Sequence, residues 1–93
     1  MTLRIIAGRL VSSATTIGST AAPIPTTAAT GRISIGITNK GAETLYIGGS
    51  DVTVVNGTPI EPSEKYPMDL AEKALVYGIT ASGNVDVRSL EGV

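Results

Sequence analysis

A large apolar side chain occupies every second position in the stretch Ile33-Ser34-Ile35-Gly36-Ile37-Thr38. Successive side chains of a β-strand point to opposite faces of the sheet, so this period of two predicts a strand with one buried and one exposed face. The residues that follow are typical of a turn, Asn39-Lys40-Gly41. The stretch therefore predicts a half-buried strand that ends in a turn.

The same alternation continues toward the C-terminus. Further strands are predicted at residues 43–47, 52–54, 66–70, 75–79 (with Leu75, Tyr77 and Ile79 alternating) and 85–90. Pro67 indicates a strand at a sheet edge, and Asn56-Gly57 predicts a tight turn. Short strands separated by turn residues predict an all-β fold, a small antiparallel sandwich or barrel of jelly-roll type. A parallel βαβ fold is excluded because no segment is long enough for its crossover helix.

The N-terminal third has a different composition. Residues 12–30 are almost all Ser, Thr, Ala, Gly and Pro, and only Ile17 and Ile24 are large and apolar. Such a segment buries too little surface to offset the entropy of ordering it, so we expect it to be extended and to need a partner. Two regions are predicted: an extended N-terminal arm over residues 1–30 and a β-sandwich body over residues 31–93. The alternative for the arm is a simple linker.

The body has few means of stabilising itself alone. The chain has 93 residues with no Cys, Trp or Phe, and its only aromatic side chains are three Tyr. A domain of this size buries about 60–65% of its unfolded surface, and disulfides are not available to compensate. We therefore expect a homo-oligomer.

Charge is distributed unevenly along the chain. Four basic residues and no acid precede Glu43, whereas eight acids and three basic residues follow from there, giving +4 and −5 (3 − 8) for the two parts. A basic arm on an acidic body suits docking on a neighbouring subunit. The net charge of −1 gives no case for binding nucleic acid, and no apolar run is long enough for a membrane span or a secretion signal.

The sequence lacks the residue types on which the common catalytic mechanisms depend. The chain has no His and no Cys, which removes the usual triads and the usual zinc and haem ligands. Asp51, Asp69 and Asp86 lie near the ends of predicted strands, where a carboxylate cluster or calcium site stays open as an alternative to strand termination. The expectation is a protein without catalytic residues, cofactor, metal or small-molecule substrate.

Five segments in the second two-thirds of the chain occur in an order that resembles small virion proteins of tailed bacteriophages: Thr38-Asn39-Lys40-Gly41, Leu45-Tyr46-Ile47-Gly48-Gly49-Ser50-Asp51-Val52-Thr53, Asn56-Gly57-Thr58-Pro59-Ile60, Leu75-Val76-Tyr77-Gly78-Ile79 and Val85-Asp86-Val87-Arg88-Ser89-Leu90-Glu91. The likeness covers roughly residues 33–91. It departs from the family pattern in the turn at residues 61–65, where relatives place Gly after Pro.

The resemblance implies a structural role without catalysis: a capsid decoration (cement) protein, or a small part of a head fibre or tail. The leading expectation is a homo-oligomer, most simply a trimer, on the outer surface of the capsid, where it stabilises the shell through contacts with the major capsid protein. The arm would pair with a neighbour by strand addition. Its expected partner-binding residues are Leu3, Arg4, Ile5, Ile6, Arg9, Leu10 and Val11.

The alternative function is a receptor- or glycan-binding module of a tail or head fibre. It requires the three tyrosines, Tyr46, Tyr66 and Tyr77, to be exposed together with carboxylates near one end of the sandwich. The competing interpretation is that these tyrosines fill or rim the small core.

Overall fold

A computed structural model describes residues 8–93 of the chain. The expected partner-binding residues Leu3, Arg4, Ile5 and Ile6 lie outside the described residues. Arg9, Leu10 and Val11 lie within them.

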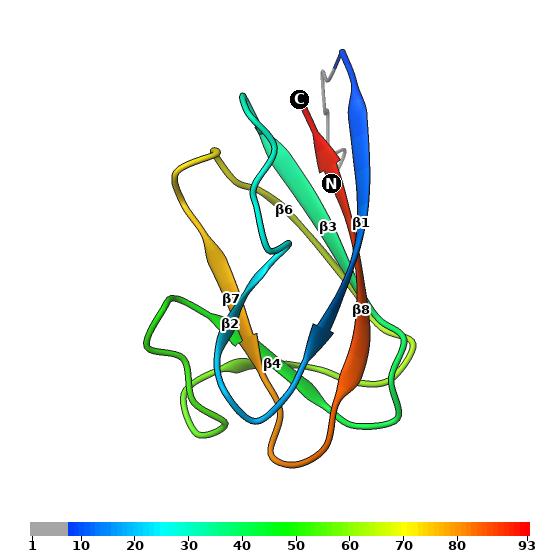
Figure 1. The fold of residues 1–93 in the computed structure, drawn as a ribbon, viewed down its shortest axis with the longest axis vertical. Coiled ribbons are helices and arrows are strands. Elements are labelled where there is room, and N and C mark those ends of the chain that lie inside the picture. The colour runs from blue at the N-terminus through cyan, green and yellow to red at the C-terminus, as the bar shows by residue number, and fades with distance from the viewer. Residues whose placement is uncertain (1–7) are drawn as a thin grey trace.

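The described residues form eight strands: β1 Leu10–Ile17, β2 Ala22–Ile24, β3 Ser34–Asn39, β4 Leu45–Gly48, β5 Thr58–Ile60, β6 Lys65–Asp69, β7 Val76–Ile79 and β8 Val85–Gly92. They build two four-stranded antiparallel sheets, in the orders β1-β8-β3-β6 and β2-β7-β4-β5 (Figure 1). The prediction of an all-β sandwich is confirmed. Among residues 8–93, no helix has the length and apolar character to cross a membrane.

The strand pairing has a simple rule. The first strand pairs with the last, the second with the seventh, the third with the sixth and the fourth with the fifth. A long hairpin folded over itself gives this arrangement, which is that of a jelly roll. The fold therefore agrees with the predicted type.

The predicted boundary between arm and body at residue 30 is wrong for the described residues. β1 runs beside β8 over its whole length, and β2 pairs with β7 (Figure 1). Ile17 and Ile24 are 0% and 1% exposed and belong to the core. The partner that the segment needs is thus the C-terminal strand of its own chain. β8 pairs with the backbone of β1 at every second residue, so a segment rich in Ser and Thr forms a strand here although it buries few apolar side chains.

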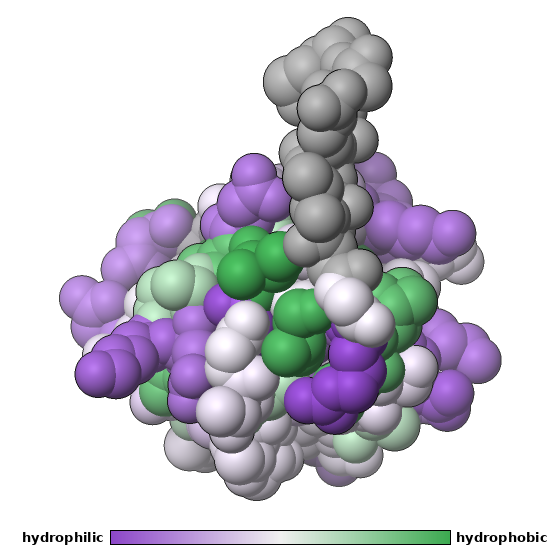
Figure 2. All heavy atoms as spheres, turned by 90° about the horizontal axis from the view of Figure 1, so that it is seen from above, coloured by the Kyte–Doolittle hydropathy of each residue, from purple (hydrophilic) through white to green (hydrophobic). Residues whose placement is uncertain are grey.

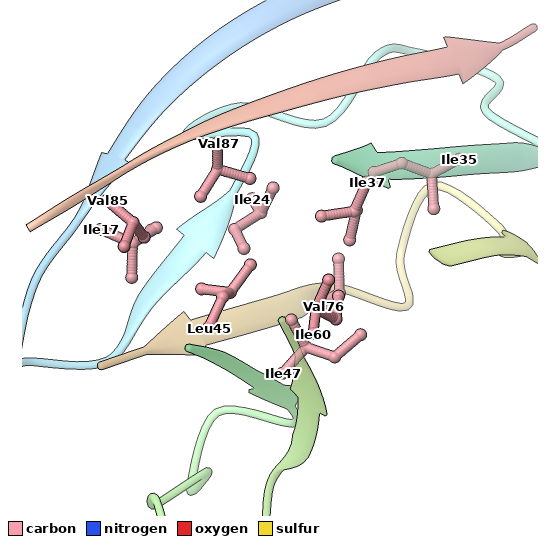
Figure 3. Packing of buried hydrophobic residues seen from close by; sticks show 10 residues of the cluster. All are labelled: Ile17, Ile24, Ile35, Ile37, Leu45, Ile47, Ile60, Val76, Val85 and Val87. Carbon is pink, nitrogen blue, oxygen red and sulfur yellow. The ribbon is translucent and has the colours of Figure 1, made fainter. Parts of the chain in front are cut away.

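The hydrophobic core between the two sheets is a cluster of aliphatic side chains without an aromatic member (Figure 3). Because β-branched residues have one preferred rotamer in strands, they lose little freedom on burial. The ten buried members come from seven of the eight strands: Ile17, Ile24, Ile35, Ile37, Leu45, Ile47, Ile60, Val76, Val85 and Val87.

Two predicted strands need correction. Val52 and Val54 lie in the loop before β5, and the strand begins only at Thr58, after the Asn56-Gly57 turn. In β7 the inward positions are Val76 and Gly78, so Leu75 lies outside the core. A Cβ at position 78 would approach the Cδ1 atom of Ile24 to 2.6 Å, which shows that neighbouring side chains fill the space of the missing one.

Candidate interaction surface

The most buried polar group of the described chain is an ion pair. Arg32 Nη1 donates to Glu91 Oε2 at 3.0 Å, and neither side chain is exposed to solvent. Arg32 Nη2 also donates to the carbonyls of Ala71 and Ala74, at 3.2 and 2.9 Å. The amide of Ala29 donates to Glu91 Oε2 at 2.9 Å. The pair therefore ties the segment before β3 and the loop after β6 to the end of β8.

This polar cluster is closed. Arg32 Nε, Glu91 Oε1 and Ser89 Oγ are buried without a protein partner in the structure, but no part of the ion pair reaches the surface. A closed pair positions backbone rather than a substrate. Arg32 therefore contributes no charge to the basic arm that the charge distribution predicted, because Glu91 neutralises it inside the body.

The three aspartates considered for a metal site lie apart. Asp51 is in the loop after β4, Asp69 ends β6, and Asp86 lies on β8. Asp86 forms an exposed ion pair with Arg88 at 2.9 Å, and the hydrogen bond from Arg88 lowers the pKa of the Asp86 carboxyl. Within residues 8–93 no three acidic side chains come close enough to hold a metal ion.

A different surface stands out: the outer face of the sheet β1-β8-β3-β6. Strand register places its side chains in rows, one of which is Ser12, Leu90, Gly36 and Pro67. The next row is Ala14, Arg88, Thr38 and Lys65. On this face β1 and β3 present mostly small side chains, whereas β8 presents Asp86, Arg88 and Leu90. The small side chains of β1 and β3 let another protein surface approach these two strands closely.

Leu90 projects from this outer face. It is 46% exposed and borders three shallow hollows of about 430, 270 and 220 Å³. The hollows exist because its neighbour in β3 is Gly36, where a Cβ would meet no atom within 4 Å. The smallest hollow is the most apolar of the three, and Leu10 at the start of β1 forms part of its wall.

The structure brings one expected partner-binding residue onto this face and not the other two that it describes. Leu10 is 63% exposed and shares the outer face with Leu90. Val11 points to the opposite face, across from Glu91. Arg9 precedes β1 and is exposed. Seen from the end of the sandwich where β1 begins, apolar side chains alternate with hydrophilic ones rather than forming one patch (Figure 2).

Sequence reasoning missed Leu90 as a surface residue. The buried positions of β8 are Val85, Val87, Ser89 and Glu91. Leu90 is out of phase with this set. The sequence does contain the signal that identifies Leu90 as exposed, because continuing the alternation of Val85 and Val87 makes residue 90 an outward position.

The tyrosines divide between the two sheets. Tyr46 and Tyr77 lie on the outer face of the sheet β2-β7-β4-β5, opposite Pro59 and Pro23 of its edge strands. Tyr66 belongs to β6 of the other sheet, beside an apolar groove of about 290 Å³. The three tyrosines therefore do not form one cluster, but two of them share a face.

Compared with known proteins, the chain matches no protein-family model and no curated protein.

Proposed function

We propose that this protein is a structural component of a virus particle, a capsid decoration protein that binds the shell and stabilises it. The observation that carries the proposal is the outer face of the sheet β1-β8-β3-β6, where the exposed Leu90 borders three hollows. The jelly-roll fold supports it as well, since viral capsid proteins use this fold, although lectins use it too. The segment order that resembles phage virion proteins gives the third support.

Docking through this face costs little side-chain entropy. Ser12, Ala14 and Gly36 have short side chains and lose little rotamer freedom when covered. Leu90 and Leu10 supply the apolar surface, worth about 25 cal/mol for each Å² removed from water. A single contact of this size is weak. Repetition over many equivalent positions of a shell, by protein linked into homo-oligomers, raises the overall affinity without new contacts.

A matched pair of leucines tests the proposal. Leu90 and Leu75 are 46% and 45% exposed, but Leu75 lies just before β7, in the groove beside β6, and lines none of the hollows around Leu90. We expect Leu90→Asp to abolish co-sedimentation with purified shells of the virus that encodes the chain, and Leu75→Asp to leave it unchanged. Equal binding by both variants would reject this face as the docking surface, and no binding by the wild type would reject the function.

The alternative is a glycan- or receptor-binding module of a fibre, and one observation favours it. Tyr46 and Tyr77 lie on diagonal positions of adjacent strands β4 and β7, and each faces an edge proline. Diagonal neighbours on one face are about 7–8 Å apart at Cα, a spacing that suits an aromatic platform for a sugar ring.

This alternative makes its own prediction. Tyr77→Ala should remove binding to a glycan array, and Tyr66→Ala, on the other sheet, should not. Absence of glycan binding by the wild-type protein would reject the alternative and leave the decoration function untouched.

A further inference from the structure

The two sheets have four edges, formed by β1, β6, β2 and β5. Unpaired edge strands invite other chains to pair with them, and proteins discourage this with proline, charged residues or very short strands. β2 and β5 each have three residues with a central proline, Pro23 and Pro59. Both edges of the second sheet are thus protected.

The β6 edge of the first sheet is protected as well. Residues 39 and 64, and residues 33 and 70, are joined by backbone hydrogen bonds between β3 and its neighbour. Because bonded pairs alternate along an antiparallel ladder, Pro67 lies at a non-bonded position opposite Gly36. Its missing N–H therefore faces the open edge, where Lys65 and Asp69 add charge on either side.

β1 has none of these features. Its sequence, Leu10 to Ile17, has eight residues and contains neither proline nor a charged side chain. Arg9 and Val93 exchange both backbone hydrogen bonds, at 3.1 and 2.8 Å. The bonded pairs with β8 therefore continue at residues 11, 13, 15 and 17. The N–H and C=O groups of residues 10, 12, 14 and 16 point away from β8, to an edge that no strand of the described chain covers.

We propose that β1 pairs with β1 of a second copy of this chain, antiparallel about a two-fold axis. This inference rests on the proposed function only in taking the protein as a homo-oligomer. The residues whose N–H and C=O groups point away from β8 all find a partner when Leu10 lies opposite Thr16 of the second copy and Ser12 lies opposite Ala14 of the second copy. Four bonded pairs then form, with about eight backbone hydrogen bonds. The two first sheets become one continuous sheet.

The chemistry of β1 favours a second copy over another partner. In a two-fold strand pair residue 12 meets residue 14 of the second copy and residue 13 meets its own copy, so charges of one sign along the strand would repel each other across the axis. β1 has no charge over its whole length. A closed trimer would instead require β1 to pair with a different edge, and each of the other three contains a proline. The geometry therefore favours a dimer over the trimer expected from the sequence.

A charge exchange at two exposed positions tests the pairing. Ser12 and Ala14 both point to the outer face, and Ala14 lies opposite Arg88 within the chain. Ser12→Glu with Ala14→Glu places like charges opposite one another across the axis, so we expect light scattering to give one chain per particle. Ser12→Lys with Ala14→Glu places opposite charges there and should retain the two chains of the wild type. Both variants carry the same Ala14→Glu substitution beside Arg88, so they differ from each other only at position 12.

A cysteine cross-link reads the register directly. The chain contains no cysteine, and Ser13 would lie opposite Ser13 of the second copy at a non-bonded pair, where side chains are closest. Ser13→Cys should form a dimeric disulfide on mild oxidation, and Thr15→Cys, on the same side of β1, should not.

The proposal is overturned if the wild type is a monomer or trimer, if the double-Glu variant stays dimeric, or if both charge variants are monomers. A monomer that still decorates shells would overturn this pairing alone, leaving the proposed function standing.

Discussion

Arg32 and Glu91 meet at 3.0 Å in the interior of the sandwich, with both side chains fully removed from solvent. Burying two charges is favourable only while each has its partner, and removing one partner of such a pair costs about 3–5 kcal/mol. We expect Glu91→Gln to lower the free energy of unfolding by an amount in this range. Since small domains have only about 5–15 kcal/mol in total, urea unfolding should show a large shift of the midpoint.

The exposed pair of Arg88 with Asp86 provides the control. Its side chains are about half exposed, and ion pairs in that position contribute little to stability. Arg88→Gln should leave the urea midpoint close to that of the wild type. Equal effects of Glu91→Gln and Arg88→Gln would contradict the structural role of the buried pair.

Asn39 links the two sheets through its side chain. Its Nδ2 donates to the carbonyls of Glu43 and Ile60, at 2.8 and 2.9 Å, and its Oδ1 accepts from the amide of Gly41 at 2.8 Å. Asn39→Asp keeps the acceptor but turns the donor into an oxygen that faces two carbonyl oxygens. Each buried group left unsatisfied costs about 1–3 kcal/mol, and more when it is charged.

The Asn39→Asp variant should therefore be destabilised most at neutral pH. Protonation of the new carboxyl restores one donor, so the difference from the wild type should shrink as the pH falls. Thermal unfolding at several pH values measures this. A difference that stays constant with pH would show that the donated hydrogen bonds are not what position 39 requires.

Two glycines give opposite predictions for the same substitution. A Cβ at Gly41 would lie 2.5 Å from Val85 Cβ and 2.9 Å from Val85 Cα, whereas one at Gly36 would meet nothing within 4 Å. Gly41→Ala must displace the backbone of β8, and overpacking of this kind costs about 1–3 kcal/mol. Gly36→Ala should be neutral or slightly stabilising, because Gly in a strand is entropically unfavourable. Similar unfolding midpoints for the two variants would contradict the close approach at Gly41.

Much of the fold could be predicted because alternation is a local signal. Ile35 and Ile37 in β3, and Val85 and Val87 in β8, are buried as the period of two indicates. Position 67 is at a sheet edge, as its proline requires. The strand at Val52 and Val54 was wrong because two apolar residues in a short loop imitate alternation. The phase of β7 was wrong because a buried Gly78 contributes no apolar side chain to the pattern.

The role of residues 10–24 and of the buried ion pair could not be predicted locally. β1 pairs with a strand about 75 residues away along the chain, and Arg32 meets Glu91 across 59 residues. Neither partner can be identified from composition. A Ser- and Thr-rich segment has the same composition whether it is an edge strand of its own sheet or an arm on another subunit.

The carboxyl of Asp86 should titrate below its ordinary pKa of 3.8, chiefly because Arg88 donates hydrogen bonds to it. Desolvation raises the pKa in part, and the charges of Arg88 and Lys40 lower it further. A carboxyl whose pKa is lower in the folded state stabilises the fold above its unfolded pKa, and the contribution disappears as the pH falls through the folded value. NMR titration of the side-chain carbonyl carbon measures the shift.

The causes of the Asp86 shift can be separated. Arg88→Gln removes both the charged donor and its field, so the pKa should return to about its ordinary value of 3.8, because the two remaining influences, desolvation and the charge of Lys40, oppose each other. Salt at 1 M screens the field between exposed charges but leaves the hydrogen bonds at 3.1 and 2.9 Å in place. Salt should therefore raise the pKa of the wild type less than the substitution does. An equal rise would mean that the two side chains interact through their charges without the hydrogen bonds seen on the outer face of β8.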